Sequence, residues 1–152
     1  RPIYAECGGM FLLCETLGDI QGQSYPMGGL IPFHAQKSTL TVGYRTIKGV
    51  TSSLLICEGD KLRGHEFHRW NLIKKKKEKS IRTSKSLESC TTLKPPWEIE
   101  GWEFPKRTEG WSNKLIHASW IHLHWASCPK VLHRWRDALE KVNNDFIATG
   151  LN

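Results

Sequence analysis

The sequence predicts a single α/β domain with a partly antiparallel sheet, and three observations indicate this class. A strand pattern over residues 1–6 leads into a helical pattern that begins at Gly8. Several strand patterns follow, and a regular helical pattern over residues 130–147 comes last. The order strand, helix, strands, helix is typical of an α/β domain with an antiparallel extension, and a length of 152 residues suits one domain, 1–152.

Each element is predicted from the spacing of its apolar residues. The first helix is expected over residues 8–17, and Gly18 is suited to end it. Glycine and proline favour a loop over 21–32, while 80–96 shows no clear period and is expected to form a long loop. Strands are expected over 39–47, 61–70, 97–102 and 115–125. One face of the last helix carries Val131, Leu132, Trp135, Leu139, Val142 and Phe146.

The net charge of +7 is concentrated in one segment. Residues 74–85 contain seven lysines and arginines and one acid, Glu78, and the region of about 74–96 is interpreted as a basic loop insertion. A run of lysines usually marks a solvated loop. Because no aromatic residue lies between Trp70 and Trp97, the stacking platform of a nucleic-acid site is missing there, and no nucleic-acid partner is expected.

Composition also restricts the cellular setting. No apolar run approaches the roughly 18 residues of a membrane helix, and no signal-peptide pattern follows residues 1–5. The five cysteines are odd in number and form no Cys-x-x-Cys pair, which favours free thiols in a reducing cytosol. We therefore expect a cytoplasmic protein with no membrane partner. Because residues 1–5 have the pattern of the middle of a strand, we also expect the chain to be part of a longer protein.

The segment Glu6-Cys7-Gly8-Gly9 carries the clearest chemical signal. A cysteine between a strand and a helix is how a thiol nucleophile is presented on a sharp turn. The glycines are expected to permit backbone geometry that a Cβ would block, and the helix N-terminus is expected to lower the pKa of the thiol. The backbone N–H of Gly8 is then placed to bind a developing oxyanion.

A thiol nucleophile needs a base, and the histidine-rich segment 118–125 offers one. In a strand, His122 and His124 share a face with Trp120. The alternative is a pair of surface or hydrogen-bonded histidines. A second cluster contains His65 and His68, which face opposite ways in a strand and make a poor chelate. A zinc site shared by the four histidines of the two clusters is a further alternative, but no matching acidic or thiol pattern accompanies them, so no metal site is expected.

Five motifs follow one another along the chain: PIYAECGGM (2–10), YPMGGLIP (25–32), GYR (43–45), GHEFH (64–68) and ASWIHLHW (118–125). Together they closely resemble the C-terminal glutaminase domain of the cobyrinate a,c-diamide synthase family. Enzymes of this family amidate the corrin precursor in cobalamin biosynthesis. The resemblance covers nearly the whole chain except the basic segment.

The resemblance implies part of a class I glutamine amidotransferase domain of flavodoxin-like fold, with a mixed sheet and a nucleophile elbow at Cys7. In this family the glutaminase releases ammonia from glutamine. A synthetase domain activates the a and c carboxylates of a tetrapyrrole with ATP and Mg²⁺. No cofactor is implied for the present chain, since ATP and Mg²⁺ belong to the synthetase domain; a homodimer is a further expectation.

The same resemblance assigns roles by position. Cys7 matches the nucleophile that forms a γ-glutamyl thioester. His122 matches the histidine that activates this cysteine and protonates the leaving ammonia, and Gly8 provides an oxyanion N–H. Gly9 and His124 are candidates for orienting or substrate contacts.

Glu66 is another candidate substrate contact, with a buried ion pair to an arginine such as Arg45 as the alternative. One departure from the class I pattern concerns His124, which stands where these enzymes usually have a glutamate that orients the histidine. A dyad or another orienting group is then needed.

The second departure is that the preceding strands, the glycine-rich oxyanion loop and the synthetase domain are not found in the sequence, which also has no Gly-x-x-x-x-Gly-Lys-Ser/Thr motif. We therefore expect the isolated chain to hydrolyse glutamine poorly. A non-catalytic remnant or interaction module of a truncated amidotransferase stays open as an alternative. So does service of the same module in the diamidation of hydrogenobyrinate or nickel-sirohydrochlorin.

Overall fold

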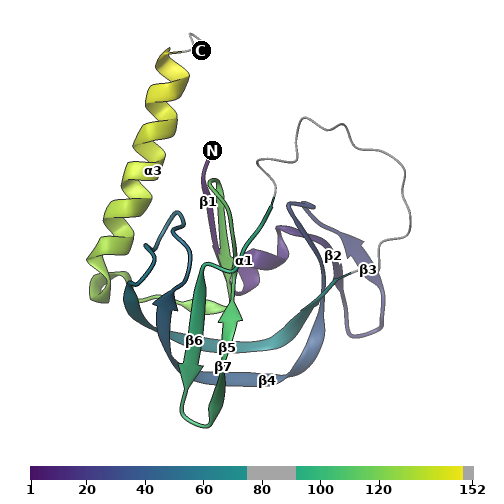
Figure 1. Ribbon diagram of the computed structural model, residues 1–152. Coiled ribbons are helices and arrows are strands. Elements are labelled where there is room, and N and C mark those ends of the chain that lie inside the picture. The colour runs from purple at the N-terminus through teal and green to yellow at the C-terminus, as the bar shows by residue number, and fades with distance from the viewer. Residues whose placement is uncertain (75–91, 149–152) are drawn as a thin grey trace.

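The computed structural model describes residues 1–74 and 92–148, with side chains up to Lys141 in the last helix. Figure 1 shows strands gathered into a curved body, with one long helix along its edge. The helices are α1 (Gly8–Phe11), the 3₁₀ turn η1 (Trp125–Ser127) and α3 (Pro129–Ala148). The strands are β1 (Ile3–Glu6), β2 (Cys14–Gly18), β3 (Ser24–Pro26), β4 (Ile31–Gly49), β5 (Lys61–Ile73), β6 (Trp97–Gly101), β7 (Phe104–Glu109), β8 (Trp111–Ser112), β9 (Ile116–Ser119) and β10 (Ile121–His122).

The strands form two sheets of mixed direction. The smaller sheet has the order β1-β9-β8, with β1 parallel to β9 and Ala5 opposite Ala118. The larger sheet has the order β10-β5-β4-β2-β3, and β6 joins it on β4 and carries β7. Only the β2–β4 pair of the larger sheet is parallel among the described strands. Mixed sheets with few helices confirm the predicted α/β class.

The long antiparallel pair β4–β5 is the central part of the larger sheet and crosses the lower part of the view in Figure 1. Its side chains alternate between the two faces, as expected of a half-buried sheet. On β4, Arg45 and Ile47 are buried while Tyr44 and Thr46 between and beside them are exposed. The two strands pair from Lys48 back to His34, and a register shift between Lys37 and Thr41 interrupts the ladder.

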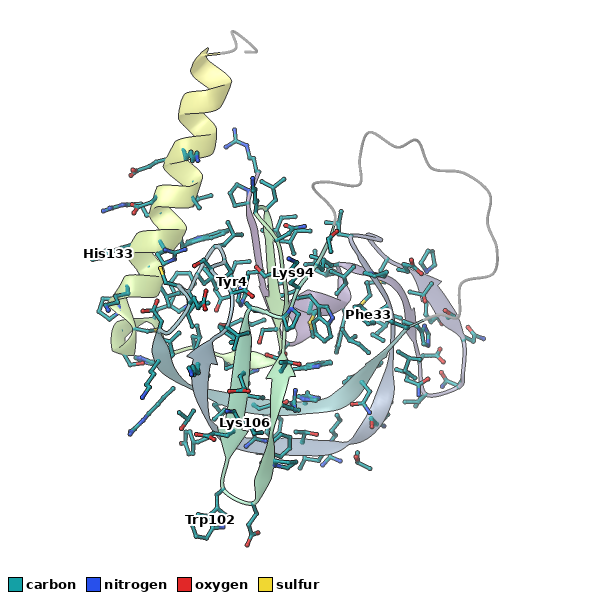
Figure 2. The ribbon with its side chains drawn as sticks, in the orientation of Figure 1. Tyr4, Phe33, Lys94, Trp102, Lys106 and His133 are labelled. Atoms are coloured by element: carbon teal, nitrogen blue, oxygen red, sulfur yellow. The ribbon has the colours of Figure 1, made fainter. Side chains whose placement is uncertain are left out.

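Two apolar clusters hold the sheets together. One packs α1 and β2 against the smaller sheet, with Met10, Cys14 and Ala118 fully buried. The other packs β6 and β10 against α3 through Trp97, Ile121 and Val131. Trp102 lies outside both clusters, at the tip of the β6–β7 hairpin (Figure 2).

The helix predicted over residues 8–17 is wrong beyond Phe11. After one turn the chain enters β2, which pairs parallel to β4 and antiparallel to β3. The apolar residues expected on one helical face are buried in one core cluster or packed against it, and their spacing fits a buried strand as well as a helix. The segment before β4 packs closely on the start of β2 at Gly28, whose N–H donates to the carbonyl of Leu12 at 2.9 Å. A Cβ at this position would lie 2.6 Å from that carbonyl oxygen.

The strand predicted over residues 115–125 divides into two. β9 ends at Ser119 and belongs to the smaller sheet, whereas β10 pairs with β5 in the larger one. Side chains bind the backbone at the break: the N–H of Trp120 donates to Glu109 at 2.9 Å and that of Ile121 to the Ser119 hydroxyl at 2.9 Å. The expectation that Trp120, His122 and His124 share one strand face is therefore wrong.

The other expectations fare better. The strands predicted at 39–47, 61–70 and 97–102 and the helix at 130–147 are confirmed, although β4 begins earlier, and the loop predicted at 21–32 contains β3 and the start of β4. Most of the basic segment 74–96 lies outside the described residues; within it, Lys94 forms a bridge with Ser112. No helix of the described chain is long and apolar enough to cross a membrane.

Candidate active site

Cys7 occupies the turn between β1 and α1. Its backbone has φ 45° and ψ −110°, a region that non-glycine residues rarely adopt. Its N–H donates to the carbonyl of Ser119 at 2.8 Å, and its carbonyl accepts from Met10 at 3.0 Å. The thiol lies 3.6 Å from the carbonyl oxygen of Phe67 on β5. Such strain persists only where its surroundings fix it, and it is frequent at active sites.

The structure corrects the expected role of the two glycines. The left-handed conformation belongs to Cys7 itself, whereas neither Gly8 nor Gly9 has a positive φ. A Cβ built on Gly8 would meet nothing within 4 Å, and one on Gly9 would meet only the Ala5 Cβ at 3.9 Å. Close packing therefore does not require a glycine at either position in the described structure.

The expected lowering of the thiol pKa is also wrong. Burial raises the pKa of Cys7 above its ordinary value, and the nearby charge of Glu6 adds to the rise. The backbone N–H of Gly8 acts in the opposite direction but does not outweigh burial. The helix behind the thiol has only four residues, which gives little dipole to stabilise a thiolate. The thiol therefore needs a base to remove its proton.

His122 lies close to the same stretch of β5 as the thiol. His122 pairs with His65 on β5. The Cys7 thiol contacts the carbonyl of Phe67, two residues further along the same strand. The side chain is 42% exposed, and its Nδ1 lies 3.5 Å from Oε2 of Glu6. Glu6 directly precedes Cys7, so one short segment contacts the histidine and carries the thiol.

His124 lies two residues after His122, outside any strand. Its carbonyl accepts hydrogen bonds from the Ser127 hydroxyl at 2.7 Å and the Cys128 thiol at 3.3 Å. Its exposed side chain lines a cavity of about 610 Å³ together with His122. Arg63, His65, Tyr44 and Trp102 also line it.

Glu66 has all of its acceptor capacity directed into the protein. Oε2 accepts from Arg45 Nε at 2.8 Å, and Oε1 accepts from Arg107 at 2.6 Å and lies 2.9 Å from His68 Nε2. Burial alone would raise its pKa, but the His68 hydrogen bond and the charges of Arg107 and Arg45 outweigh this and lower the pKa. Glu66 is fully buried and forms the ion pair with Arg45. Neither carboxylate oxygen is exposed to a substrate.

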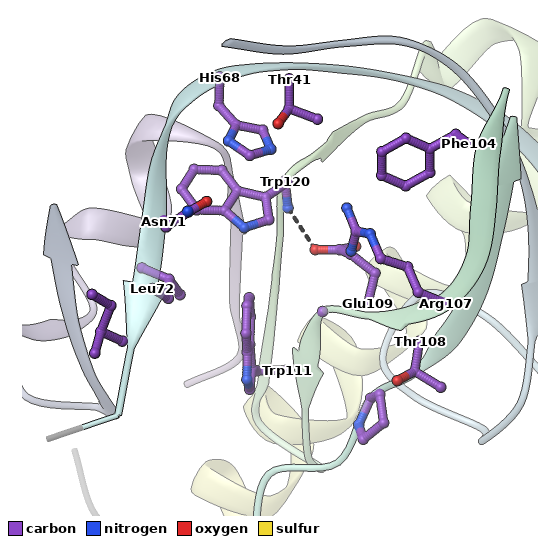
Figure 3. A pocket seen from close by; sticks show the side chains of 13 residues that line it. Thr41, His68, Asn71, Leu72, Phe104, Arg107, Thr108, Glu109, Trp111 and Trp120 are labelled. Carbon is purple, nitrogen blue, oxygen red and sulfur yellow. Dashed lines mark hydrogen bonds between the residues drawn. The ribbon is translucent and has the colours of Figure 1, made fainter. Parts of the chain in front are cut away.

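A second cavity, of about 560 Å³, lies beyond this ion-pair cluster and contains neither Cys7 nor His122 in its wall. Figure 3 shows His68 stacked on Trp120, with Glu109 and Arg107 across from them. The two rings are 4.0 Å apart between centroids and 15° from parallel. Because the thiol and His122 are absent from its lining, we do not assign the substrate to this cavity.

Sequence reasoning missed Glu109, which braces the break between β9 and β10. Its carboxylate accepts from Trp97 Nε1 at 2.6 Å, from the Ser119 hydroxyl at 2.6 Å and from the N–H of Trp120 at 2.9 Å. Burial raises its pKa despite these three donors. Since the carbonyl of Ser119 also accepts from Cys7, Glu109 supports the segment that joins the thiol to His122. Its sequence context carries no signal for this role.

No group of three or more His, Cys, Asp or Glu side chains within residues 1–74 and 92–148 is placed to hold a metal ion. The thiols of Cys7, Cys14, Cys57 and Cys128 are free in the same part of the chain. The chemistry available at the strained turn is thus that of a thiol, an imidazole and a neighbouring carboxylate.

An α/β domain with mixed sheets is the class expected of a glutamine amidotransferase, and comparison with known proteins identifies that class. Residues 1–129 match the CobB/CobQ-like glutamine amidotransferase domain, and the chain belongs to this family. It is 31% identical over 142 residues to the cobyrinate a,c-diamide synthase of Salmonella typhimurium, and 35% identical over 127 residues to that of Gloeobacter violaceus. It is 34% identical over 135 residues to the hydrogenobyrinate a,c-diamide synthase of Streptomyces coelicolor.

These alignments cover 92%, 83% and 88% of the chain, in the same order. They cover 28%, 24% and 23% of the relatives, so the chain spans about a quarter of the length of these proteins. Membership of an enzyme family follows from the match. The match does not extend to the remaining three quarters of these relatives.

Proposed function

We propose that this chain is the ammonia-supplying part of an ATP-dependent cobyrinate-type a,c-diamide synthase in cobalamin biosynthesis. The single observation that carries the proposal is the strained Cys7 between β1 and α1, with its thiol beside the strand that pairs with His122. A strand–turn–helix cysteine next to a histidine is the arrangement that nucleophilic amide chemistry requires.

The steps follow from the groups present. His122 removes the Sγ proton of Cys7, which is needed because burial raises the pKa of this thiol. The sulfur attacks the side-chain amide carbon of glutamine, and the backbone N–H of Gly8 stabilises the resulting oxyanion. The carbon–nitrogen bond then breaks, and His122 returns the proton to the departing ammonia.

The product of this half-reaction is a γ-glutamyl thioester on Cys7. Water activated by His122 cleaves the thioester, which releases glutamate and restores the thiol. The ammonia is used elsewhere, to convert activated carboxylates of a tetrapyrrole into amides. The ATP and Mg²⁺ that the family resemblance implies for the synthetase part enter none of these steps.

The relatives carry two names, cobyrinate and hydrogenobyrinate a,c-diamide synthase, and the corresponding tetrapyrrole diacids are the proposed acceptors. The chain itself is proposed to recognise glutamine.

The experiment is covalent capture of the thiol by a glutamine-analogue diazoketone in the full-length protein. We expect one adduct on Cys7, protection by glutamine, and no adduct in Cys7→Ser. Cys14→Ser is the matched control, because Cys14 is a fully buried thiol whose pKa burial raises to about 11, and this variant should be captured normally. Equal capture of wild type and Cys7→Ser would contradict the proposal.

A further inference from the structure

Glu6 is next to Cys7 in the chain and faces His122 in space. It is the last residue of β1 and directly precedes Cys7. Its Oε1 accepts a hydrogen bond from the Tyr4 hydroxyl and another from the N–H of Leu123 at 3.1 Å. Its Oε2 is then left facing Nδ1 of His122 at 3.5 Å. The Glu6 side chain therefore connects the end of β1, next to the thiol, to His122 at the end of β10 and to Leu123 after it.

The donors that hold Oε1 are themselves held. The Tyr4 ring stacks on Trp125 with centroids 5.8 Å apart and 21° from parallel, and it packs against Trp135 at 6.0 Å. Burial and the hydrogen bond to Glu6 raise the pKa of Tyr4, so its hydroxyl keeps the proton that it donates. The Leu123 N–H is part of the backbone that follows His122. The orientation of the carboxylate is thus set by packing on both sides.

We propose that Glu6 is the positioning residue of His122, and that it takes the role usually held by a glutamate two residues after the histidine. This inference rests on the proposed glutamine hydrolysis. The carboxylate can only accept, so it selects the tautomer of His122 that carries its proton on Nδ1. Nε2 is then free to accept the thiol proton, and the carboxylate stabilises the imidazolium that forms. At position 124 this chain has a histidine, which points into the neighbouring cavity.

The substitution Glu6→Gln separates this role from a structural one. Glutamine keeps the length and one oxygen, which can still accept from Tyr4 and Leu123. Its amide nitrogen then faces Nδ1 and donates to it, which moves the imidazole proton to Nε2 and removes the base. Glu6→Asp keeps the charge but falls one methylene short of the ring. If the negative charge beside His122 is what matters, Glu6→Asp retains more activity than Glu6→Gln.

The experiment measures glutamine hydrolysis by the full-length protein. In Glu6→Gln, we expect kcat to fall by about 10²–10⁴-fold with KM changed by less than about twofold. In Glu6→Asp, we expect a loss of only about tenfold. Glu15→Gln is the matched control, since it removes an exposed carboxylate from β2 and should leave both constants unchanged. Thermal unfolding of each variant shows that the proteins are folded.

Two results would overturn the inference: a wild-type kcat in Glu6→Gln, or an equal loss in Gln and Asp variants accompanied by a raised KM. If Glu6→Gln does not fold, Glu6→Ala decides instead, because a wild-type kcat in a protein with no carboxylate beside His122 would contradict the inference. Failure of the proposed function gives a different pattern. In that case the wild type would hydrolyse no glutamine, or Cys7→Ser and His122→Ala would retain hydrolysis; failure of the present inference alone leaves the wild type active and both variants inactive.

Discussion

His117 gives the structure a pH dependence that can be calculated. It lies in β9 with no exposed surface, and neither ring nitrogen has a hydrogen-bond partner within the described part of the chain. Its neighbours are aromatic: the Trp97 ring is 4.6 Å away and the Tyr4 ring 5.7 Å, both near edge-on. With nothing to stabilise a charge, burial lowers the pKa of His117 from 6.5 to about 3.

The sign of the effect follows from proton binding. Between about pH 6.5 and pH 3 the unfolded chain holds a proton on His117 that the folded chain excludes, so stability falls as the pH falls through this window. At about pH 5 the solution is some 1.5 units below the unfolded pKa, and each unit corresponds to about 1.4 kcal/mol. His117 alone should therefore reduce the free energy of unfolding by about 2 kcal/mol at pH 5 relative to pH 7.5.

The test is urea unfolding, followed by tryptophan fluorescence, at about pH 5 and about pH 7.5. His117→Phe keeps an aromatic ring without a titrating group and should lose about 2 kcal/mol less than wild type between the two pH values. His117→Gln, which also cannot titrate but stays polar, controls for the gain in apolar packing and should show the same reduced slope. Equal losses in wild type and both variants would refute the reasoning.

Three further predictions concern the framework of the site. Glu66→Gln leaves Arg45 buried beside a neutral partner and should cost about 3–5 kcal/mol of unfolding free energy, measured by urea titration; a loss below about 1 kcal/mol would count against the ion pair. Gly64→Ala places a Cβ 2.3 Å from Cγ2 of Ile121, so β10 must shift. We expect a lower free energy of unfolding and a lower kcat for glutamine hydrolysis. Wild-type values of both would contradict this packing. Alkylation of Cys7 by iodoacetamide should accelerate only above the pH range of an ordinary thiol, because burial raises its pKa; a rapid reaction near neutral pH would oppose this.

The parts of the site that sequence could supply are those carried by short segments. The turn cysteine and the two histidine-containing motifs were recognisable because each is contiguous. The strand period also placed His65 and His68 on opposite faces, and the structure agrees: His65 packs on Tyr44 outside, and His68 binds Glu66 inside. The Arg45–Glu66 ion pair, one of the two roles that the sequence leaves open for Glu66, is present.

The parts that sequence could not supply depend on contacts between distant segments. The Leu123 N–H that fixes Glu6 is 117 residues away from it, and no local pattern indicates that contact. The break between β9 and β10 depends on Glu109, whose carboxylate replaces ladder hydrogen bonds at Trp120. The sequence does not predict the short length of α1, because apolar spacing over residues 8–17 fits a buried strand as well as a helix.

The expected thiolate shows the same limit. A cysteine before a helix favours ionisation only if the helix is long enough and the sulfur is solvated. The structure gives a four-residue helix and a partly buried thiol, so burial prevails. This outcome makes His122 more important to the proposed chemistry, because the thiol is not ionised in advance.

The most direct test of the account is to detect the acyl-enzyme itself. Full-length protein is mixed with glutamine, quenched in acid within the turnover time, digested and analysed by mass spectrometry. We expect a γ-glutamyl thioester on the peptide that contains Cys7, and a lower yield in His122→Ala, which lacks the base that removes the thiol proton. Glutamine hydrolysis that proceeds at the full rate with no adduct on Cys7, or with the adduct on another cysteine, would contradict the central claim.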